Sequence, residues 1–153
     1  MVAGLIRGLQ PDYVIETGSA WGQTAEAIGK ALLRNGRGFL HSIELDTHRV
    51  AATRQRCDGL PVEVHRMSSL DFSPALDYTA QPVIDLAFFD SLLELRVPEF
   101  RRFRPWMRVG TIVAFHDTRP GRDLRDDIER ELSDAIRFIH LPTPRGITIG
   151  EVF

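Results

Sequence analysis

The stretch Val14-Ile15-Glu16-Thr17-Gly18-Ser19-Ala20-Trp21-Gly22-Gln23-Thr24 decides the fold. In it an apolar run leads to an acidic residue and two glycines, and a segment with helical character follows. A second apolar run then ends at Glu44. In a nucleoside-binding βαβ unit, glycines let the backbone approach the ligand, and an acidic side chain about 20 residues further on accepts hydrogen bonds from ribose hydroxyls. The stretch therefore predicts a cofactor that contains a nucleoside.

Length and composition limit the class of protein. With 153 residues, 43% of them hydrophobic, the chain is long enough for one core and too short for two ordinary domains, so we expect a single domain over residues 1–153. A net charge of −2 gives no reason to expect a nucleic acid or a membrane surface as partner. The single cysteine, Cys57, cannot form an internal disulfide, and no signal peptide or membrane span is evident, which favours the cytoplasm.

Apolar runs and turn residues alternate regularly along the chain. Strands are predicted over Tyr13–Thr17, Phe39–Leu45, Val62–Arg66, Ile84–Phe89, Thr111–Phe115, Ile136–Leu141 and Ile147–Val152. Helices are predicted over Gln23–Arg34, Thr47–Cys57, Leu93–Phe103 and Asp123–Ala135, with Asp46 or Thr47 as the N-cap of the second. The last two strands flank only five turn residues, 142–146, so they must form an antiparallel hairpin after a mostly parallel sheet.

Five βα units followed by a β-hairpin resemble the class I S-adenosylmethionine-dependent methyltransferases, and most closely their small O-methyltransferase-like branch. The residues that carry the resemblance are Glu16-Thr17-Gly18-Ser19-Ala20-Trp21-Gly22, Ser42-Ile43-Glu44, Phe88-Phe89-Asp90 and Ala114-Phe115-His116-Asp117-Thr118. The resemblance implies a Rossmann-like α/β fold, doubly wound, with a seven-stranded mostly parallel sheet of order 3-2-1-4-5-7-6 and an antiparallel terminal hairpin. It also implies a cofactor over the carboxyl ends of strands 1, 2 and 4, where an open parallel sheet binds its ligands.

The glycine spacing distinguishes between two cofactors. A dinucleotide fingerprint, G-x-G-x-x-G, would need further glycines where Ala20 and Gln23 stand, so a nicotinamide-dependent oxidoreductase is disfavoured. S-adenosylmethionine carries a free amino acid, whose ammonium Glu16 can attract directly or through water. The cofactor-binding residues expected from the motifs and the resemblance are Glu16, Gly18, Ser19, Gly22, Glu44, Ser68, Ser69 and Asp90.

Asp90, His116 and Asp117 are the expected catalytic residues, because they follow the fourth and fifth strands. In metal-dependent relatives, carboxylates at these positions hold a divalent cation such as Mg²⁺, which here would use Asp90 and Asp117. In a metal-free version His116 would be the general base. The relatives' Asp-Gly-x-His motif is replaced by Asp90-Ser91-Leu92-Leu93, which weakens the metal version, and Asp90 could instead cap the next helix.

The leading hypothesis is methylation of a small-molecule hydroxyl, with a small-molecule substrate, no nucleic acid and no membrane. The alternative is a non-catalytic cofactor-binding module with a degenerate methyltransferase fold. Many relatives carry helices before the glycine loop that close over the substrate, and this segment is short here. Either another subunit covers the substrate, which implies a homodimer, or the substrate is large, or the site is open. The histidines His41, His48, His65 and His140 are scattered and show no metal-ligand spacing.

Overall fold

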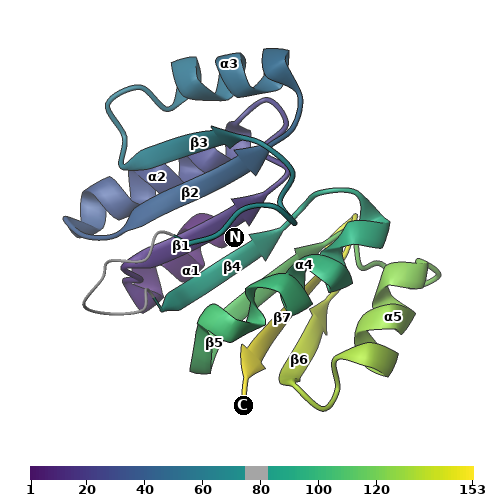
Figure 1. Cartoon of the computed structure of the whole chain (residues 1–153). Coiled ribbons are helices and arrows are strands. Elements are labelled where there is room, and N and C mark those ends of the chain that lie inside the picture. The colour runs from purple at the N-terminus through teal and green to yellow at the C-terminus, as the bar shows by residue number, and fades with distance from the viewer. Residues whose placement is uncertain (75–82) are drawn as a thin grey trace. The chain divides into compact units, whose positions relative to one another are not determined.

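The computed structural model describes residues 1–74 and 83–153 of the chain. Its internal contacts divide the chain into two compact units, Met1–Ser73 and Pro74–Phe153. Figure 1 shows the elements of both. The expectation of a single domain over residues 1–153 stays a prediction. Among the described helices, none combines the length and the apolar composition needed to cross a membrane.

The first unit is a three-stranded parallel sheet with its helices. In chain order it contains α1 (Val2–Leu9), β1 (Tyr13–Thr17), α2 (Gln23–Asn35), β2 (Phe39–Glu44), α3 (Thr47–Arg56) and β3 (Val62–Arg66). The strands lie in the order β3-β2-β1 (Figure 1). Val14 and Ile15 of β1 are fully buried, as expected of the apolar run of a parallel strand.

Local chemistry explains where the helices of this unit begin and end. Gly36 follows α2 with φ = 69°, a left-handed conformation that glycine adopts without strain. Asp46 is the N-cap of α3, because its side chain accepts a hydrogen bond of 2.9 Å from the Arg49 amide. Of the two predicted caps, the structure therefore selects Asp46.

The second unit is a mixed sheet. It contains β4 (Ile84–Phe89), η1 (Leu93–Leu95), α4 (Arg96–Phe103), η2 (Arg104–Trp106), β5 (Met107–His116), α5 (Asp123–Glu131), β6 (Ile136–Leu141) and β7 (Ile147–Val152). The strands lie in the order β4-β5-β7-β6, and β7 runs antiparallel to both of its neighbours (Figure 1). The two units therefore contain both halves of the predicted order, 3-2-1 and 4-5-7-6, and the predicted hairpin.

Aromatic side chains form the core of the second unit. Phe89 of β4 stacks on Phe115 of β5 with ring centroids 4.9 Å apart, and on Phe103 of α4 at 6.4 Å. Phe100, also on α4, tilts against Phe115 at 6.3 Å. All four rings are at most 2% exposed. This packing fixes the ends of β4 and β5, where the candidate catalytic residues lie.

The structure differs from the prediction in a few elements. The helix α1 was not predicted, since Gly4 and Gly8 give this segment a low helix propensity, yet Val2 and Ile6, one turn apart, are buried. β5 begins four residues earlier than predicted, and its irregular register with β4 accommodates Gly110 at φ = 90°. α5 ends at Glu131, before the predicted end.

One of the five predicted βα units is not tested by the described residues. Five βα units require a helix after every one of the first five strands. The described part of the connection between β3 and β4, residues 67–74 and 83, contains no helix. The rest of that connection, residues 75–82, lies outside the described residues.

Candidate active site

The predicted glycine loop lies between β1 and α2 and is held in left-handed backbone conformations. Gly18 has φ = 79°, Ala20 φ = 47° and Gly22 φ = 80°. A Cβ on Gly22 would lie 2.9 Å from the Cα of Thr53 in α3, so a side chain there would be both strained and blocked. The alanine at a positive φ is uncommon and marks a loop whose conformation its surroundings impose.

Glu44 lies against this loop, as the sequence predicts. Its Oε2 accepts a hydrogen bond of 2.9 Å from the Ala20 amide, while Oε1 accepts from Leu45 and Asp46 at 2.9 and 3.0 Å. Only 8% of the residue is exposed. Each carboxylate oxygen has two lone pairs, so Oε1 is already saturated, whereas Oε2 can still accept a further hydrogen bond from a ribose hydroxyl.

Glu16 and Ser19 are less accessible than expected of ligand contacts. Glu16 is fully buried, and its Oε2 accepts a hydrogen bond of 2.5 Å from the Ser42 hydroxyl. Ser19 is 4% exposed, with its hydroxyl 3.3 Å from that of Thr53. The negative charge of Glu16 therefore lies beneath the loop rather than at its surface.

Cys57 behaves as a structural residue. Burial, and then the charge of Glu16, raise the pKa of its thiol to about 11. Such a thiol stays protonated at neutral pH and is a poor nucleophile.

Ser68 and Ser69 lie in the turn after β3, also in the first unit. The Ser68 hydroxyl accepts a hydrogen bond of 3.3 Å from the Leu70 amide, and its carbonyl accepts one of 3.1 Å from Asp71. Ser69 is 8% exposed. The turn is thus ordered by its own hydrogen bonds, and its expected contact with adenine stays a prediction.

In the second unit, the ends of β4 and β5 bring Asp90 and His116 together. Phe89 pairs with Phe115 in the parallel register, so the residues that follow them are neighbours. Nδ1 of His116 lies 2.9 Å from Oδ1 of Asp90. The following helical segments, η1 and α4, begin after Leu92 and Leu95 with no side-chain cap, so Asp90 does not serve as their N-cap.

Arg96 joins the strand ends, and sequence analysis did not identify it. Its side chain, only 3% exposed, donates to Oδ1 of Asp90 at 3.2 Å and lies 3.6 Å from Oδ2 of Asp117. It also donates to the carbonyls of Ser91 and His116. Burial lowers the pKa of Arg96, and the charges of Asp90 and Asp117 oppose that shift. The signal that could have revealed it is an arginine at the start of the predicted helix that follows the acidic end of the fourth strand.

Asp117 is held by the β6–β7 turn. It has φ = 59°, and its two oxygens accept hydrogen bonds of 2.5 and 2.7 Å from Arg145. Backbone hydrogen bonds join this turn to the segment after β5: the amides of Thr118 and Arg119 donate to the carbonyls of Gly146 and Arg145. A Cβ on Gly146 would lie 2.1 Å from the Arg119 nitrogen, so this close approach requires glycine.

The charges around Asp117 determine its protonation. Burial by itself would raise the pKa of its carboxyl group. The hydrogen bonds from Arg145 and the positive charges of His116, Arg145 and Arg96 outweigh burial and hold the pKa below its ordinary value. Asp117 is therefore a carboxylate at neutral pH.

The strand-end cluster Asp90, His116 and Asp117 has three side chains whose ligand atoms lie close enough to share a metal ion. Their other partners argue against Mg²⁺, which requires near-octahedral oxygen coordination. Both oxygens of Asp117 accept hydrogen bonds from Arg145, and Oδ1 of Asp90 accepts one from Arg96. A second cation would compete with these guanidinium groups for the same carboxylates, and the magnesium site stays a prediction.

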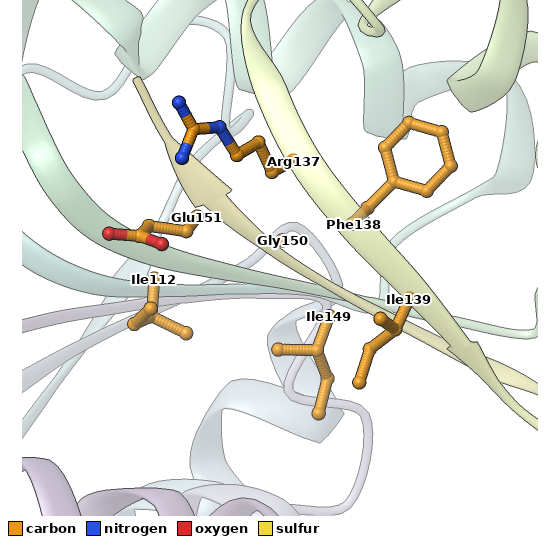
Figure 2. A pocket seen from close by; sticks show the side chains of 7 residues that line it. All are labelled: Ile112, Arg137, Phe138, Ile139, Ile149, Gly150 and Glu151. Carbon is orange, nitrogen blue, oxygen red and sulfur yellow. The ribbon is translucent and has the colours of Figure 1, made fainter.

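A separate hollow of about 220 Å³ lies on the sheet surface of the second unit (Figure 2). Ile112, Ile149 and Ile139 contribute apolar side chains from β5, β7 and β6. Arg137 and Glu151 lie at its margin. None of the expected catalytic residues lines it, so it is not the site predicted from the motifs.

Comparison with solved structures establishes the fold. An O-methyltransferase from Streptomyces achromogenes involved in tomaymycin synthesis, solved with SAM, is 20% identical and has a TM-score of 0.82 over 99% of this chain and 77% of its own. An O-methyltransferase from Bacillus cereus, solved with SAH, is 15% identical with a TM-score of 0.83 over 99% and 79%. A SAH-bound methyltransferase from Podospora anserina is 15% identical with a TM-score of 0.81 over 99% and 76%. These likenesses confirm the predicted Rossmann-like methyltransferase fold.

The sequence itself identifies the family. Among curated proteins, none matches this chain significantly. A family model described as a methyltransferase domain matches residues 15–118, from within β1 to just beyond β5. The match spans more than half of the chain and includes the glycine loop, Glu44, Asp90, His116 and Asp117. The chain therefore belongs to the methyltransferase domain family.

Proposed function

We propose that the protein is an S-adenosylmethionine-dependent O-methyltransferase acting on a hydroxyl group of a small molecule. Membership of the methyltransferase domain family supports the reaction class. The O-methyltransferases with the same fold that were solved with SAM or SAH support the donor and the acceptor atom. The observation that carries the proposal is the pairing of His116 with Asp90, because it gives the chain a base for a hydroxyl acceptor.

The first unit contains the cofactor-binding residues. S-adenosylmethionine supplies a methyl group bonded to a positively charged sulfur. Gly18 and Gly22 keep the loop backbone free of side chains, and Glu44 accepts hydrogen bonds from the ribose hydroxyls. The buried charge of Glu16 attracts the ammonium group through the loop rather than by direct contact. Ser19 shapes the loop, and Ser68 and Ser69 border the adenine.

The second unit contains the residues that act on the acceptor. With Nδ1 of His116 donating its proton to Asp90, Nε2 carries a lone pair and can accept the proton of the hydroxyl. The carboxylate of Asp90 fixes this tautomer and stabilises the imidazolium that forms. Asp117 and Arg96 position the two residues. The contact of Asp90 with the cofactor stays a prediction.

This assignment requires no divalent cation, because Arg96 and Arg145 already neutralise the carboxylates of Asp90 and Asp117. We expect turnover to be unchanged when Mg²⁺ is added up to millimolar concentration. A magnesium-dependent rate that Asp117→Asn abolishes would restore the metal version.

The test separates binding from chemistry. Calorimetry with S-adenosylmethionine should show saturable binding, while NAD should not bind. Release of the demethylated donor, S-adenosylhomocysteine (SAH), is then measured with a panel of small hydroxyl compounds. His116→Ala should lower the rate by about 10²–10⁴-fold, the usual contribution of general base catalysis, and leave donor affinity unchanged. Glu44→Gln should weaken donor binding instead, and exposed His48 provides the control, His48→Ala.

Other results would exclude parts of the proposal. Binding of NAD instead of the methyl donor would overturn the cofactor assignment. Donor binding with no transfer to any acceptor would favour the non-catalytic module, and undiminished transfer by His116→Ala would remove the proposed base.

For location and partners we propose the cytoplasm, a small-molecule substrate and a homodimer, with no nucleic acid and no membrane. The buried free thiol of Cys57 is compatible with a reducing compartment. Light scattering of the purified chain tests the homodimer, and a monomer at all concentrations would exclude it.

A further inference from the structure

A second cluster of potential ligands lies in the first unit, on the surface of β2 and β3. His41 of β2 pairs with Glu63 of β3 in the parallel register, and His65 follows two residues later. Alternate residues of a strand share a face, so His41, Glu63 and His65 project from the same side. Ser42 and Glu44, which belong to the donor-binding region, project from the other side of β2. The sequence separates these histidines by 24 residues, and the strand register brings them together, contrary to the expectation that they are scattered.

Three atoms of this cluster form a compact triangle. Nδ1 of His41 lies 3.0 Å from Nε2 of His65. Oε2 of Glu63 lies 3.8 Å from each of these nitrogens. The point equidistant from the corners of a triangle with sides of 3.0, 3.8 and 3.8 Å lies about 2.1 Å from each atom, which is the usual length of a zinc–imidazole or zinc–carboxylate bond. The three ligand atoms are thus already spaced as an ion of this size requires.

The surroundings keep both imidazoles in the form that binds metals. Burial lowers the pKa of His41 first, and the nearby His65 adds to the shift, while Glu63 opposes it. Burial also lowers the pKa of His65, again with Glu63 opposing. Neutral imidazole is the ligand form, and protons on Nε2 of His41 and Nδ1 of His65 leave Nδ1 of His41 and Nε2 of His65 with the lone pairs that a metal needs.

Aromatic rings hold the two histidines in place. The ring of His41 stacks on that of Tyr13, with centroids 4.7 Å apart, and Phe39 lies 5.3 Å away. Phe72 packs against His65 at 4.7 Å. The side chains of His41 and His65 are 13% and 20% exposed, whereas that of Glu63 is 59% exposed. The two nitrogens are thus fixed and the carboxylate faces solvent, which leaves room for a water as fourth ligand.

We propose that His41, Glu63 and His65 bind a divalent transition metal of the zinc class, with a water completing the coordination. Two imidazoles and one carboxylate suit Zn²⁺ or Co²⁺, whereas Mg²⁺ and Ca²⁺ prefer oxygen ligands alone. The ion would tie β3 to β2 through side chains. The proposal does not depend on the methyl-transfer function, because none of its ligands has a role there.

The competing explanation is a metal-free hydrogen bond between the two imidazoles. It accounts for the 3.0 Å contact but assigns no role to Glu63, whose carboxylate is equally distant from both nitrogens. The two explanations therefore differ in what happens when the carboxylate is changed. Glu63→Gln keeps the shape of the side chain, and substitutions at exposed positions such as this one change stability little.

The experiment titrates the full chain, treated with a chelator and desalted, with Zn²⁺ in a calorimeter and with Co²⁺ in a spectrophotometer. We expect one strongly bound ion per chain and visible Co²⁺ absorption bands. Glu63→Gln and His65→Gln should each weaken binding at least about 10-fold, since loss of even an outer-sphere partner of a metal ligand costs 10- to 100-fold. Added Zn²⁺ should raise the thermal midpoint of the unaltered chain and not that of Glu63→Gln.

Two further variants locate the ion. His48→Gln, on exposed α3, is the matched control in the same unit and should bind Zn²⁺ normally. His116→Gln removes the imidazole of the strand-end cluster and should also bind normally. The proposal is overturned if no ion binds, if Glu63→Gln and His65→Gln bind as tightly as the unaltered chain, or if only His116→Gln loses the ion. Circular dichroism confirms that each variant is folded.

Discussion

The two units build their candidate sites in different ways. In the first, backbone groups hold the key carboxylate: the Ala20, Leu45 and Asp46 amides donate to Glu44. In the second, Asp90, Asp117, Arg96 and Arg145 hold one another through charged side chains. A backbone-built site depends on conformations that particular residues permit, whereas a side-chain network depends on charge balance. Substitutions that disturb backbone conformation should therefore be the costly ones in the first unit. In the second unit, the costly ones should be those that remove a charge.

The largest expected effect on stability is that of Arg96→Met in the second unit. It removes the buried cation between Asp90 and Asp117, and breaking a buried ion pair by removing one partner costs about 3–5 kcal/mol. Chemical denaturation measures the loss. The control in the same helix is Arg101→Met, whose partner is Glu131 and whose side chain is 59% exposed, so its cost should stay below about 1 kcal/mol. Equal losses in both variants would contradict a charge-built site.

Next in size is Gly22→Ala in the loop of the first unit. Its left-handed φ costs an L-residue about 1–2 kcal/mol, and the contact of 2.9 Å with the Thr53 Cα adds to this. Gly36→Ala separates the two causes, because Gly36 has a similar φ and nothing within 4 Å of the added Cβ. We expect Gly22→Ala to be the more destabilising of the two by chemical denaturation. If they are equal, the loop does not depend on close packing against α3.

An acid titration tests whether the charge of Asp117 stabilises the second unit. The pKa of Asp117 is lower in the folded chain than in the unfolded chain. Its contribution to stability is therefore complete above the unfolded pKa of about 4. That contribution is lost as the pH falls through the folded pKa. Thermal midpoints measured from pH 7 to pH 3 should therefore fall less steeply for Asp117→Asn. Asparagine tolerates the left-handed backbone at this position, so the variant differs from the unaltered chain in charge and not in backbone strain. Parallel curves for both proteins would mean that the network is not electrostatic.

The smallest expected effect is that of Asp46→Ala, which removes the N-cap of α3. Loss of such a cap costs about 1 kcal/mol. Asp46→Asn retains an acceptor for the Arg49 amide and should restore most of the difference in denaturation midpoint. Because α3 supports the glycine loop through Thr53, donor affinity should weaken slightly in the alanine variant and recover in the asparagine variant.

The first unit was the more predictable of the two, and particular residues show why. The strand Tyr13–Thr17, the glycines after it and the end of α2 at Gly36 follow from local conformational preferences. In the second unit the strand ends Asp90 and His116 were predicted, but Arg96 and Arg145 were not. Neither arginine has a local motif, and each reaches Asp117 only because α4 and the β6–β7 turn fold back toward the end of β5.

By itself, the sequence determined the class of fold, the bounds of most strands, the antiparallel hairpin and the family, because each follows from hydrophobic period, turn chemistry and residue order along the chain. Only the tertiary structure decided which charges meet. Arg96 and Arg145 bind the carboxylates that a metal was expected to use, and the register of β2 with β3 brings His41, Glu63 and His65 into one triangle. The physical reason is that most of these contacts join side chains more than 20 residues apart, and such contacts depend on register and packing, which no local preference encodes.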